Sequence, residues 1–531
     1  MSSGRQTGKT THSDLKTGIS SDKAEQQQLL KHEEAARVLG KKTNNQELKG
    51  SWTLRLFLSL IAATLGSFQF GYHIGCVNIP AAIIIRWYMD SHKYLFGKEV
   101  TYDEIARFQW AITVGIFSVG GMFGGLASGW FADRMGRKGA MLFNNLIAVI
   151  AAVLMTGSKY VNAYPLMIIG RIVIGIHSGL NTGLVPMYLT EISPINLRGT
   201  LGSAHQLFIT IAILVSQFIG LPSVLGSVEN WPLVFAFTIV PAILQLCLFS
   251  ICPESPKYNL IVKKRSEQAK ADLKKLRGKE DVAAEINLME EEAAVAASMR
   301  KIGITDLFKG EYAWPMFLAI MMMCGQQLSG INVAMFFSTK IFSDAGLGEG
   351  ALYATLGMGA VNVAMTLISV YLVDHPKCGR RILLLVGFIG MQIASVLLVI
   401  SISIYNSDSK IYGFTAYASM VFVILFVVSF ATGPGSIPWF FVSELFSSAA
   451  RANASSVAVM VNWTGSFFIA TSFIFINQIL QQYTFLIFSA ILTFFVFFVW
   501  VYVPETKGRT VEDINAEFRL GKSRFGRRQR H

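Results

Sequence analysis

Amide side chains interrupt the long apolar segments of this sequence, and six of them are candidates for contacts with a solute. An amide offers both a hydrogen-bond donor and an acceptor, which suits hydroxyl groups that also do both. Polar side chains within such segments tend to face the interior of a helix bundle. The alternative is that each amide only hydrogen-bonds to a neighbouring helix. The six residues are Gln206, Gln326, Gln327, Asn332, Asn362 and Asn462.

The short stretch QQLSGIN argues against helix-to-helix bonding as the only role. Gln326, Gln327 and Asn332 gather there within less than about two helical turns. This density exceeds what contacts between helices alone would need. We therefore expect these amides to contact a solute.

A second stretch, GPGSIPWFFVSE at residues 433–444, places glycine and proline inside an apolar segment. Both residues weaken a helix, since proline lacks the N–H and glycine leaves the backbone unconstrained. We expect the segment to bend there and to close over a solute. Aromatic side chains that could pack against the C–H faces of a sugar ring lie nearby: Trp439 follows the break, Trp463 follows Asn462, and Phe430 precedes the break. With no fixed charge among them, these residues indicate a site for a neutral polyol.

Acidic residues next to basic ones mark the ends of several apolar segments. Pairs between them could hold one side of a helix bundle shut and release when the bundle rearranges, because a gate needs only a small free-energy difference between two states. The alternative is that the basic residues only determine membrane topology. The acids are Asp133, Glu191, Asp374 and Glu444, and the bases are Arg134, Arg137, Arg198, Arg380, Arg381 and Arg451.

The elements that position these residues follow from composition. The chain has 531 residues, of which 52% are hydrophobic and 15% charged. Twelve apolar runs reach about 20 residues, the length of a helix that crosses a bilayer. The sequence therefore predicts an all-α membrane protein with twelve transmembrane helices.

The chain also repeats itself. Gly136 and Gly379, in similar basic loops, lie 243 positions apart, and the prolines of PESP and PETKG, Pro253 and Pro504, lie 251 positions apart. An acid is followed seven residues later by an arginine after the fourth and the tenth run. These offsets predict two six-helix halves in parallel, the architecture of major facilitator transporters.

We divide the chain accordingly. The polar residues 1–50 are expected to form a disordered cytosolic tail, because they contain too few apolar residues for a core. The first half is placed at 51–252 and the second at 313–503, joined by a charged, partly helical cytosolic linker at 253–312. Residues 504–531 are expected to form a cytosolic C-terminal tail.

The net charge of +13 does not predict a nucleic-acid partner. Lysine and arginine concentrate after the even-numbered runs, which places both termini in the cytoplasm by the positive-inside rule. The runs contain no nucleophile–base pair and no metal-ligand cluster, so we expect neither an enzyme nor a metal or cofactor. The five cysteines suggest no disulfide framework.

From about residue 55 to 515 the chain resembles the sugar porters of the major facilitator superfamily, most closely the animal facilitative glucose transporters. The motifs that carry this resemblance are DRMGRK, GRIVIG, PMYLTEISPINLRG, HQL, PESPKY, QQLSGIN, GRR, GPGSIPWF, NWT and PETKGRT. It implies a hexose uniporter of the plasma membrane that works by alternating access, with the lipid bilayer and a hexose as its partners.

The resemblance also assigns roles to individual residues. It implies sugar contacts for Gln206, Gln326, Gln327, Asn332, Asn362 and Trp439. It implies that the pocket is lined by Phe430, Gly435, Trp463, Asn462, Ser466 and His73. Asp133, the arginines and the other acids at the span ends match the family's cytoplasmic gate.

Four departures from the family pattern keep alternatives open. The common pattern has an acid before GPG, where this chain has Ala431 and Thr432. Ser466 stands where the family has another asparagine in the pocket. The residues 323–325, Met-Cys-Gly, resemble the pattern of fructose transporters, so fructose or both sugars remain alternatives to glucose. His73 follows FGY, where sugar–proton porters have an aspartate, and this favours uniport over proton symport. A sugar sensor that does not transport is a further alternative.

Overall fold

The computed structural model describes residues 50–298, 302–375, 378–408, 411, 413–507, 509 and 511–519. Within these ranges the regular structure is entirely helical. The predicted N-terminal tail, apart from Gly50, and the last twelve residues of the predicted C-terminal tail lie outside the described residues.

The first half contains six membrane-crossing segments, and the last of them is made of two successive helices. Thr53 starts the first of these, because its hydroxyl accepts a hydrogen bond from the backbone N–H of Leu56 at 3.1 Å. The helices of this half are α2 (Leu54–Gly75), α5 (Ala111–Met135), α6 (Arg137–Tyr160), α7 (Tyr164–Ile192), α8 (Arg198–Ile219), α9 (Trp231–Ala236) and α10 (Ile239–Ile251). The shorter α3 (Ala81–Phe96) and α4 (Tyr102–Ile105) lie in the loop after α2.

The second half repeats this plan. Its helices are α13 (Ala313–Leu328), α14 (Ile331–Phe342), α15 (Gly350–Asp374), α16 (Arg380–Ser407), α17 (Thr415–Thr432), α18 (Ile437–Leu445), α19 (Ser448–Leu480) and α20 (Thr484–Tyr502). Between the halves the chain forms α11 (Ser266–Arg277) and α12 (Ala283–Ser298), and α21 (Val511–Arg519) follows the last span.

Eleven helical segments of the described chain are long and apolar enough to cross a membrane. The last of them, Ala449–Tyr502, has 54 residues and combines α19 with α20, which are joined by the turn η7 (Gln481–Tyr483). Since 54 residues exceed twice the length of one crossing, this segment supplies two. The prediction of an all-α, twelve-span membrane protein is confirmed.

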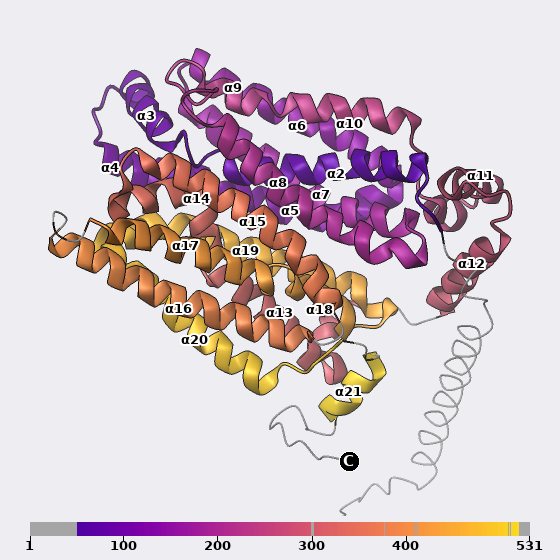
Figure 1. Ribbon diagram of the computed structural model, residues 1–531. Helices are drawn as coiled ribbons and strands as arrows, with labels where there is room; N and C mark the ends of the chain where they lie inside the picture. The colour runs from indigo at the N-terminus through magenta and orange to yellow at the C-terminus, as the bar shows by residue number, and fades with distance from the viewer. Residues whose placement is uncertain are drawn as a thin grey trace, which may run out of the picture.

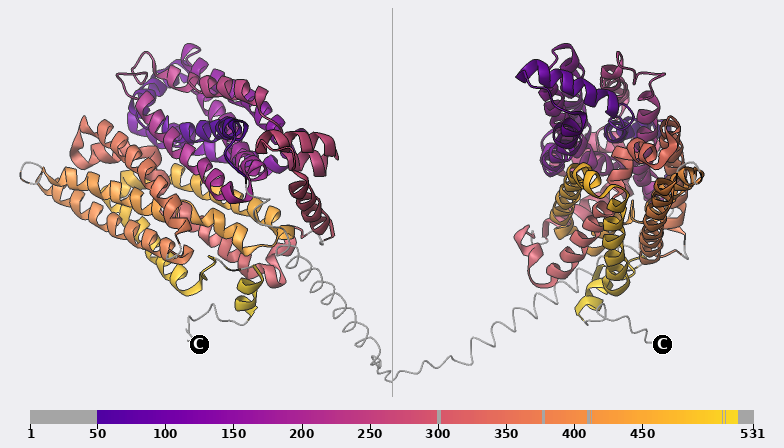
Figure 2. Two further views of the ribbon diagram at one scale, coloured as in Figure 1. Left: turned by 45° about the vertical axis from the view of Figure 1, so that its right-hand side comes forward. Right: turned by 90° about the vertical axis from the view of Figure 1, so that its left-hand side faces the viewer.

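The two halves form two bodies that lie side by side (Figures 1 and 2). We call the end of the bundle at which α11, α12 and α21 lie the linker end, and the opposite end, at which α3 lies, the α3 end (Figure 1). In the described part of the chain the halves meet mainly through α5 with α19 and α8 with α15, and also through α2 with α14.

Glycine allows the closest of these helix contacts. A Cβ atom on Gly121 of α5 would lie 2.5 Å from the indole of Trp463 on α19. A Cβ on Gly125, one turn further along, would lie 2.6 Å from Val459. Small residues at these points therefore let the two halves approach, as they do in other membrane helix interfaces.

Candidate functional site

The seventh span is broken where its amides lie. α13 ends at Leu328, and Gly330 takes the left-handed conformation, with φ 91°, before α14 begins. A Cβ at Gly330 would also lie 2.9 Å from the ring of Phe488, so both the backbone angle and the space favour glycine. The break places Gln326 and Gln327 at the end of one helix and Asn332 at the start of the next.

The tenth span is broken at the same depth, between α17 and α18. Its carbonyl groups at Pro434 and Gly435 have left the helix and need other partners, because lipid offers none. The side chain of Gln326 supplies them: its Nε2 donates to Pro434 O at 2.9 Å and to Gly435 O at 2.8 Å. One glutamine thus connects the two broken spans.

The other amides join this glutamine in one hydrogen-bond network. Asn462 Nδ2 donates to Gln326 Oε1, and Gln327 Nε2 donates to Asn462 Oδ1 at 3.0 Å. Asn332 Nδ2 donates to Gln327 Oε1 and to Ser466 Oγ, the latter at 2.8 Å. These residues are buried except Asn332, which is half-buried. We call Gln326, Gln327, Asn332, Asn462 and Ser466 the amide network.

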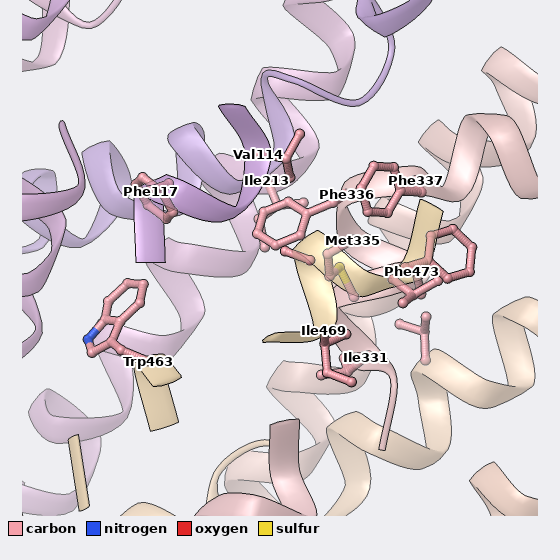
Figure 3. Packing of buried hydrophobic residues seen from close by; sticks show 14 of the residues in the cluster. Val114, Phe117, Ile213, Ile331, Met335, Phe336, Phe337, Trp463, Ile469 and Phe473 are labelled. Carbon is pink, nitrogen blue, oxygen red and sulfur yellow. The ribbon is translucent and has the colours of Figure 1, made fainter. Parts of the chain in front are cut away.

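The amide network continues into the first half of the molecule. Ser466 Oγ lies 2.9 Å from Ser118 Oγ of α5, which joins the halves by a hydrogen bond. One turn before Ser466, the ring of Trp463 packs against Phe70 and Phe117, with centroid distances of 5.5 and 5.7 Å. Figure 3 shows Trp463 and Phe117 lying close to each other among the apolar side chains of the two halves.

The remaining expected site residues lie outside this network. Among the described residues, no hydrogen bond joins Gln206, Asn362 or Trp439 to it; Asn362 is buried, and the other two are half-buried. Phe430 lies at the break of the tenth span, where its carbonyl accepts a hydrogen bond from Gly435 N at 2.9 Å.

His73 lies inside the first half rather than beside the amides. Its Nε2 is 2.8 Å from the hydroxyl of Thr238, at the join between α9 and α10, and its Nδ1 is 3.6 Å from the sulfur of Cys76. Arg171 of α7 donates to the His73 carbonyl at 3.0 Å. The neighbours of His73 that these bonds identify are therefore residues of the same half.

The charged ends of the first half form one cluster at the linker end. Arg137 pairs with Glu191, with Nε 2.9 Å from Oε2, and more weakly with Asp133 at 3.7 Å. Glu191 also accepts from the hydroxyl of Ser255. The carboxylate of Glu254 caps the start of α6, accepting from the backbone N–H groups of Arg137 and the following residue at 3.1 Å each.

The second half repeats the arginine, its paired glutamate, the hydroxyl group and the capping glutamate of this cluster. Arg380 pairs with Glu444 at 3.3 Å, and Glu444 accepts from the hydroxyl of Thr506. Glu505 caps the start of α16, accepting from the N–H groups of Arg380 at 2.8 Å and Arg381 at 3.2 Å. Every ion pair just described joins two residues of the same half.

The other charged residues at the linker end make different contacts. Arg134 lies over the ring of Trp130, with 4.9 Å to the centroid, and Arg451 donates to Phe446 O at 3.3 Å. Arg198 is exposed, and the side chain of Asp374 lies outside the described residues.

Sequence reasoning did not assign a role to Glu254, Ser255, Glu505 and Thr506, which complete the two clusters. A sequence feature that could have indicated them was present, because the tripeptides PES and PET that contain these residues recur at the repeat offset. Burial raises the pKa of the Glu254 carboxyl, while its hydrogen bonds from backbone N–H groups oppose this shift.

The sequence likewise suggested no role for Gln217 of α8. It is buried against Gly359 of α15, and both its amide atoms lack a partner in the described chain. Within the described ranges, no three His, Cys, Asp or Glu side chains gather in a way that could hold a metal ion.

Comparisons with known proteins agree with this architecture. Residues 58–518 match the protein family described as "Sugar (and other) transporter". The chain is 57% identical over 470 residues to "Facilitated glucose transporter protein 1" of Caenorhabditis elegans, covering 88% of this chain and 92% of that protein. It is 41% identical over 470 residues to "Solute carrier family 2, facilitated glucose transporter member 1" of Gallus gallus, covering 88% and 94%.

Solved structures show the same fold. The inward open conformation of the xylose transporter XylE from E. coli superposes with a TM-score of 0.70 at 25% identity, covering 87% of this chain and 99% of that one.

Proposed function

The chain belongs to the sugar transporter family, and from this premise we infer that it is a facilitative hexose transporter with D-glucose as its first substrate. It is a multi-pass membrane protein and not an enzyme. The observation that carries the proposed binding site is the amide network, which lies where two broken spans meet in the apolar interior.

We propose that a hexose binds by exchanging hydrogen bonds with this network. Its amides are already paired with one another, so both donors and acceptors are held in place before a sugar arrives. A hydroxyl group can replace an amide on either side of such a pair because it too donates and accepts. Binding therefore leaves few buried polar groups unpaired, and an unpaired group would cost about 1–3 kcal/mol.

We propose further that Gln206, Asn362 and Trp439 complete the site in a sugar-bound state. Trp439 follows the break of the tenth span, so a change of angle at that break would carry its indole toward the amide network. Phe430 and Gly435, which are joined across the same break, would line the pocket.

We propose that the linker end and both termini lie in the cytoplasm and that the protein resides in the plasma membrane. The two arginine-rich clusters and the lysine-rich helix α11 all lie at the linker end. Basic residues beside membrane spans concentrate on the cytoplasmic side.

In this orientation we propose that the structure represents a state closed toward the outside. At the α3 end, Asn78 of the first half donates to Met335 O and Ser338 Oγ of α14, at 2.9 and 2.6 Å. There too, Arg107 donates to Gln478 at the end of α19. The charged pairs at the opposite end stay within one half, and we propose that Arg198 and Arg451 find partners across the halves when the cytoplasmic side closes.

Uptake of a panel of radiolabelled sugars into proteoliposomes tests the function. We expect glucose uptake that stops when the internal and external concentrations are equal, with or without an imposed proton gradient. Fructose belongs in the panel because Met323 contacts the network: its sulfur lies 3.5 Å from Asn462 Nδ2. Uptake of neither hexose, in protein that is folded and inserted, would contradict the proposal.

A further inference from the structure

A cavity of about 560 Å³ lies at the linker end, away from the amide network, between the first-half helices and α11. Its volume is within the range of about 300–1,000 Å³ that is usual for sites of small ligands. The start of α2, the start of α6, the end of α10 and the start and middle of α11 contribute to its lining. Figure 1 shows α11 beside the ends of these helices.

Four basic side chains line the cavity: Arg55, Lys138, Arg265 and Lys275. Arg55 donates to Ile251 O at 2.6 Å, and Lys138 Nζ donates to Cys252 O at 2.8 Å. Both keep further donors, because a guanidinium has five N–H groups and an ammonium three. The side chains of Arg265 and Lys275 make no hydrogen bond or ion pair within the described part of the chain.

Two acids share the cavity, and both are bound to neutral groups. Glu254 accepts from backbone N–H groups at the start of α6. Asp272 accepts from the side-chain amides of Asn259 at 2.8 Å and Gln268 at 3.0 Å. Burial raises the pKa of the Asp272 carboxyl, while its hydrogen bonds and the charges of Lys275 and Lys138 oppose this shift. Four bases thus face two acids in the lining. The cavity therefore keeps an excess of positive charge.

The cavity also lies at the level where apolar spans end. Arg55 follows Leu54, whose side chain is 73% exposed, at the start of α2. Ile251, the last residue of α10, is 48% exposed. Exposed apolar residues at these positions face the bilayer, so lipid headgroups would lie at the height of the four bases. A soluble anion would not need this placement.

We propose that this cavity binds the phosphorylated headgroup of an anionic phospholipid, with Arg55, Lys138, Arg265 and Lys275 contacting its phosphates. Basic pockets beside membrane helices bind such headgroups, and each base contributes attraction to an anionic surface. A bound headgroup would tie α11 to the ends of α2, α6 and α10. The proposal uses the cytoplasmic orientation only to identify the leaflet.

The test is lipid retention by the full-length chain in phosphatidylcholine nanodiscs that contain a phosphatidylinositol bisphosphate. Retention is measured by native mass spectrometry, and affinity by titration with a fluorescent form of that lipid. The double variant Arg265→Gln/Lys275→Gln removes two bases from the cavity. The matched control Lys270→Gln/Lys274→Gln removes two from the same helix, where they pair with Glu267 and Glu280 outside the cavity lining.

We expect the lipid affinity to fall roughly fivefold for each cavity base removed, about twentyfold or more in total, since each contributes on the order of 1 kcal/mol. The control should change affinity by less than about twofold, and glucose uptake in phosphatidylcholine alone should be the same in both variants. Equal loss in both variants would overturn the proposal, because attraction to the surface charge would then explain binding. Equal affinity for soluble inositol trisphosphate would overturn the assignment to a lipid.

Discussion

The amide network predicts a large effect for one substitution, Gln326→Leu. The Gln326 side chain makes four hydrogen bonds: it donates to the carbonyls of Pro434 and Gly435 and accepts from Gln327 and Asn462. Leucine has a similar size and can make none of them. The variant therefore removes polar partners from a buried site without opening a large cavity.

The magnitude follows from the groups left unpaired. In the sugar complex, the hydroxyl group that Gln326 would contact loses its partner in a largely dry site, at a cost of about 1–3 kcal/mol. Since about 1.4 kcal/mol corresponds to a factor of ten, glucose uptake per molecule at the surface should fall roughly ten- to hundredfold. The two carbonyls at the break also lose their donor, so the thermal stability of the protein should fall as well.

A matched variant separates binding from stability. Gln245 of α10 is equally buried and donates to Ala62 O at 2.7 Å, but it lies within the first half, away from the network. Gln245→Leu should lower the melting temperature without changing the uptake of the molecules that remain folded. The assays are zero-trans glucose uptake normalised to surface protein, glucose binding to purified protein, and thermal unfolding. Normal uptake and binding by Gln326→Leu would refute the assignment of the sugar site.

Three further predictions concern the gate, selectivity and coupling. Asn78→Ala removes three hydrogen bonds to α14, worth about 1 kcal/mol each. It should shift the population toward a state open at the α3 end, measured as faster labelling from outside of a cysteine placed in the pathway. Met323→Gln gives Asn462 a stronger partner than sulfur and should reduce fructose uptake more than glucose uptake in a competition assay. His73→Asn should leave glucose uptake independent of a proton gradient, because His73 hydrogen-bonds within the first half.

Each of these predictions has a contradicting result. An unchanged labelling rate in Asn78→Ala would show that the α3 end is held shut by apolar packing instead. Wild-type protein whose glucose uptake ignores a large fructose excess would establish strict glucose selectivity. Sugar-induced alkalinisation of the external medium, abolished by His73→Asn, would establish proton symport. Selectivity is tested at Met323 alone, since a serine at Gly325 would bring its Cβ within 2.9 Å of Phe495 and confound the result.

The fold and part of the site could be predicted from local sequence features. Apolar runs and the repeat offset specify twelve helices in two halves, because span length and charge are properties of short segments. The grouping of Gln326, Gln327 and Asn332 was readable for the same reason, since they lie within a few residues of each other. The resemblance to sugar porters then indicated the substrate class, which the comparisons confirm.

Partners that are distant in the sequence could not be predicted. Gln326 bonds to carbonyls 108 and 109 residues away, and nothing in either segment specifies that pairing. The contact of His73 with Thr238 could not be read from its position after FGY, because the side that a helical residue faces depends on the packing of its neighbours. For the same reason the capping roles of Glu254 and Glu505 could not be predicted, because they depend on the N–H groups of helices more than a hundred residues away.

The duplicated clusters bear on how the halves could move. Each cluster ties several helix ends of one half together. The first contains Arg137 with Glu191 and Glu254, and the second contains Arg380 with Glu444 and Glu505. Such partly buried, hydrogen-bonded groups favour motion of each half as a unit over separate motion of its helices. The hydrogen bonds found between the helices of the two halves lie midway or at the α3 end. With few bonds to exchange, the two states can differ by a small free energy, so a sugar that binds one state more tightly than the other can change which one is populated.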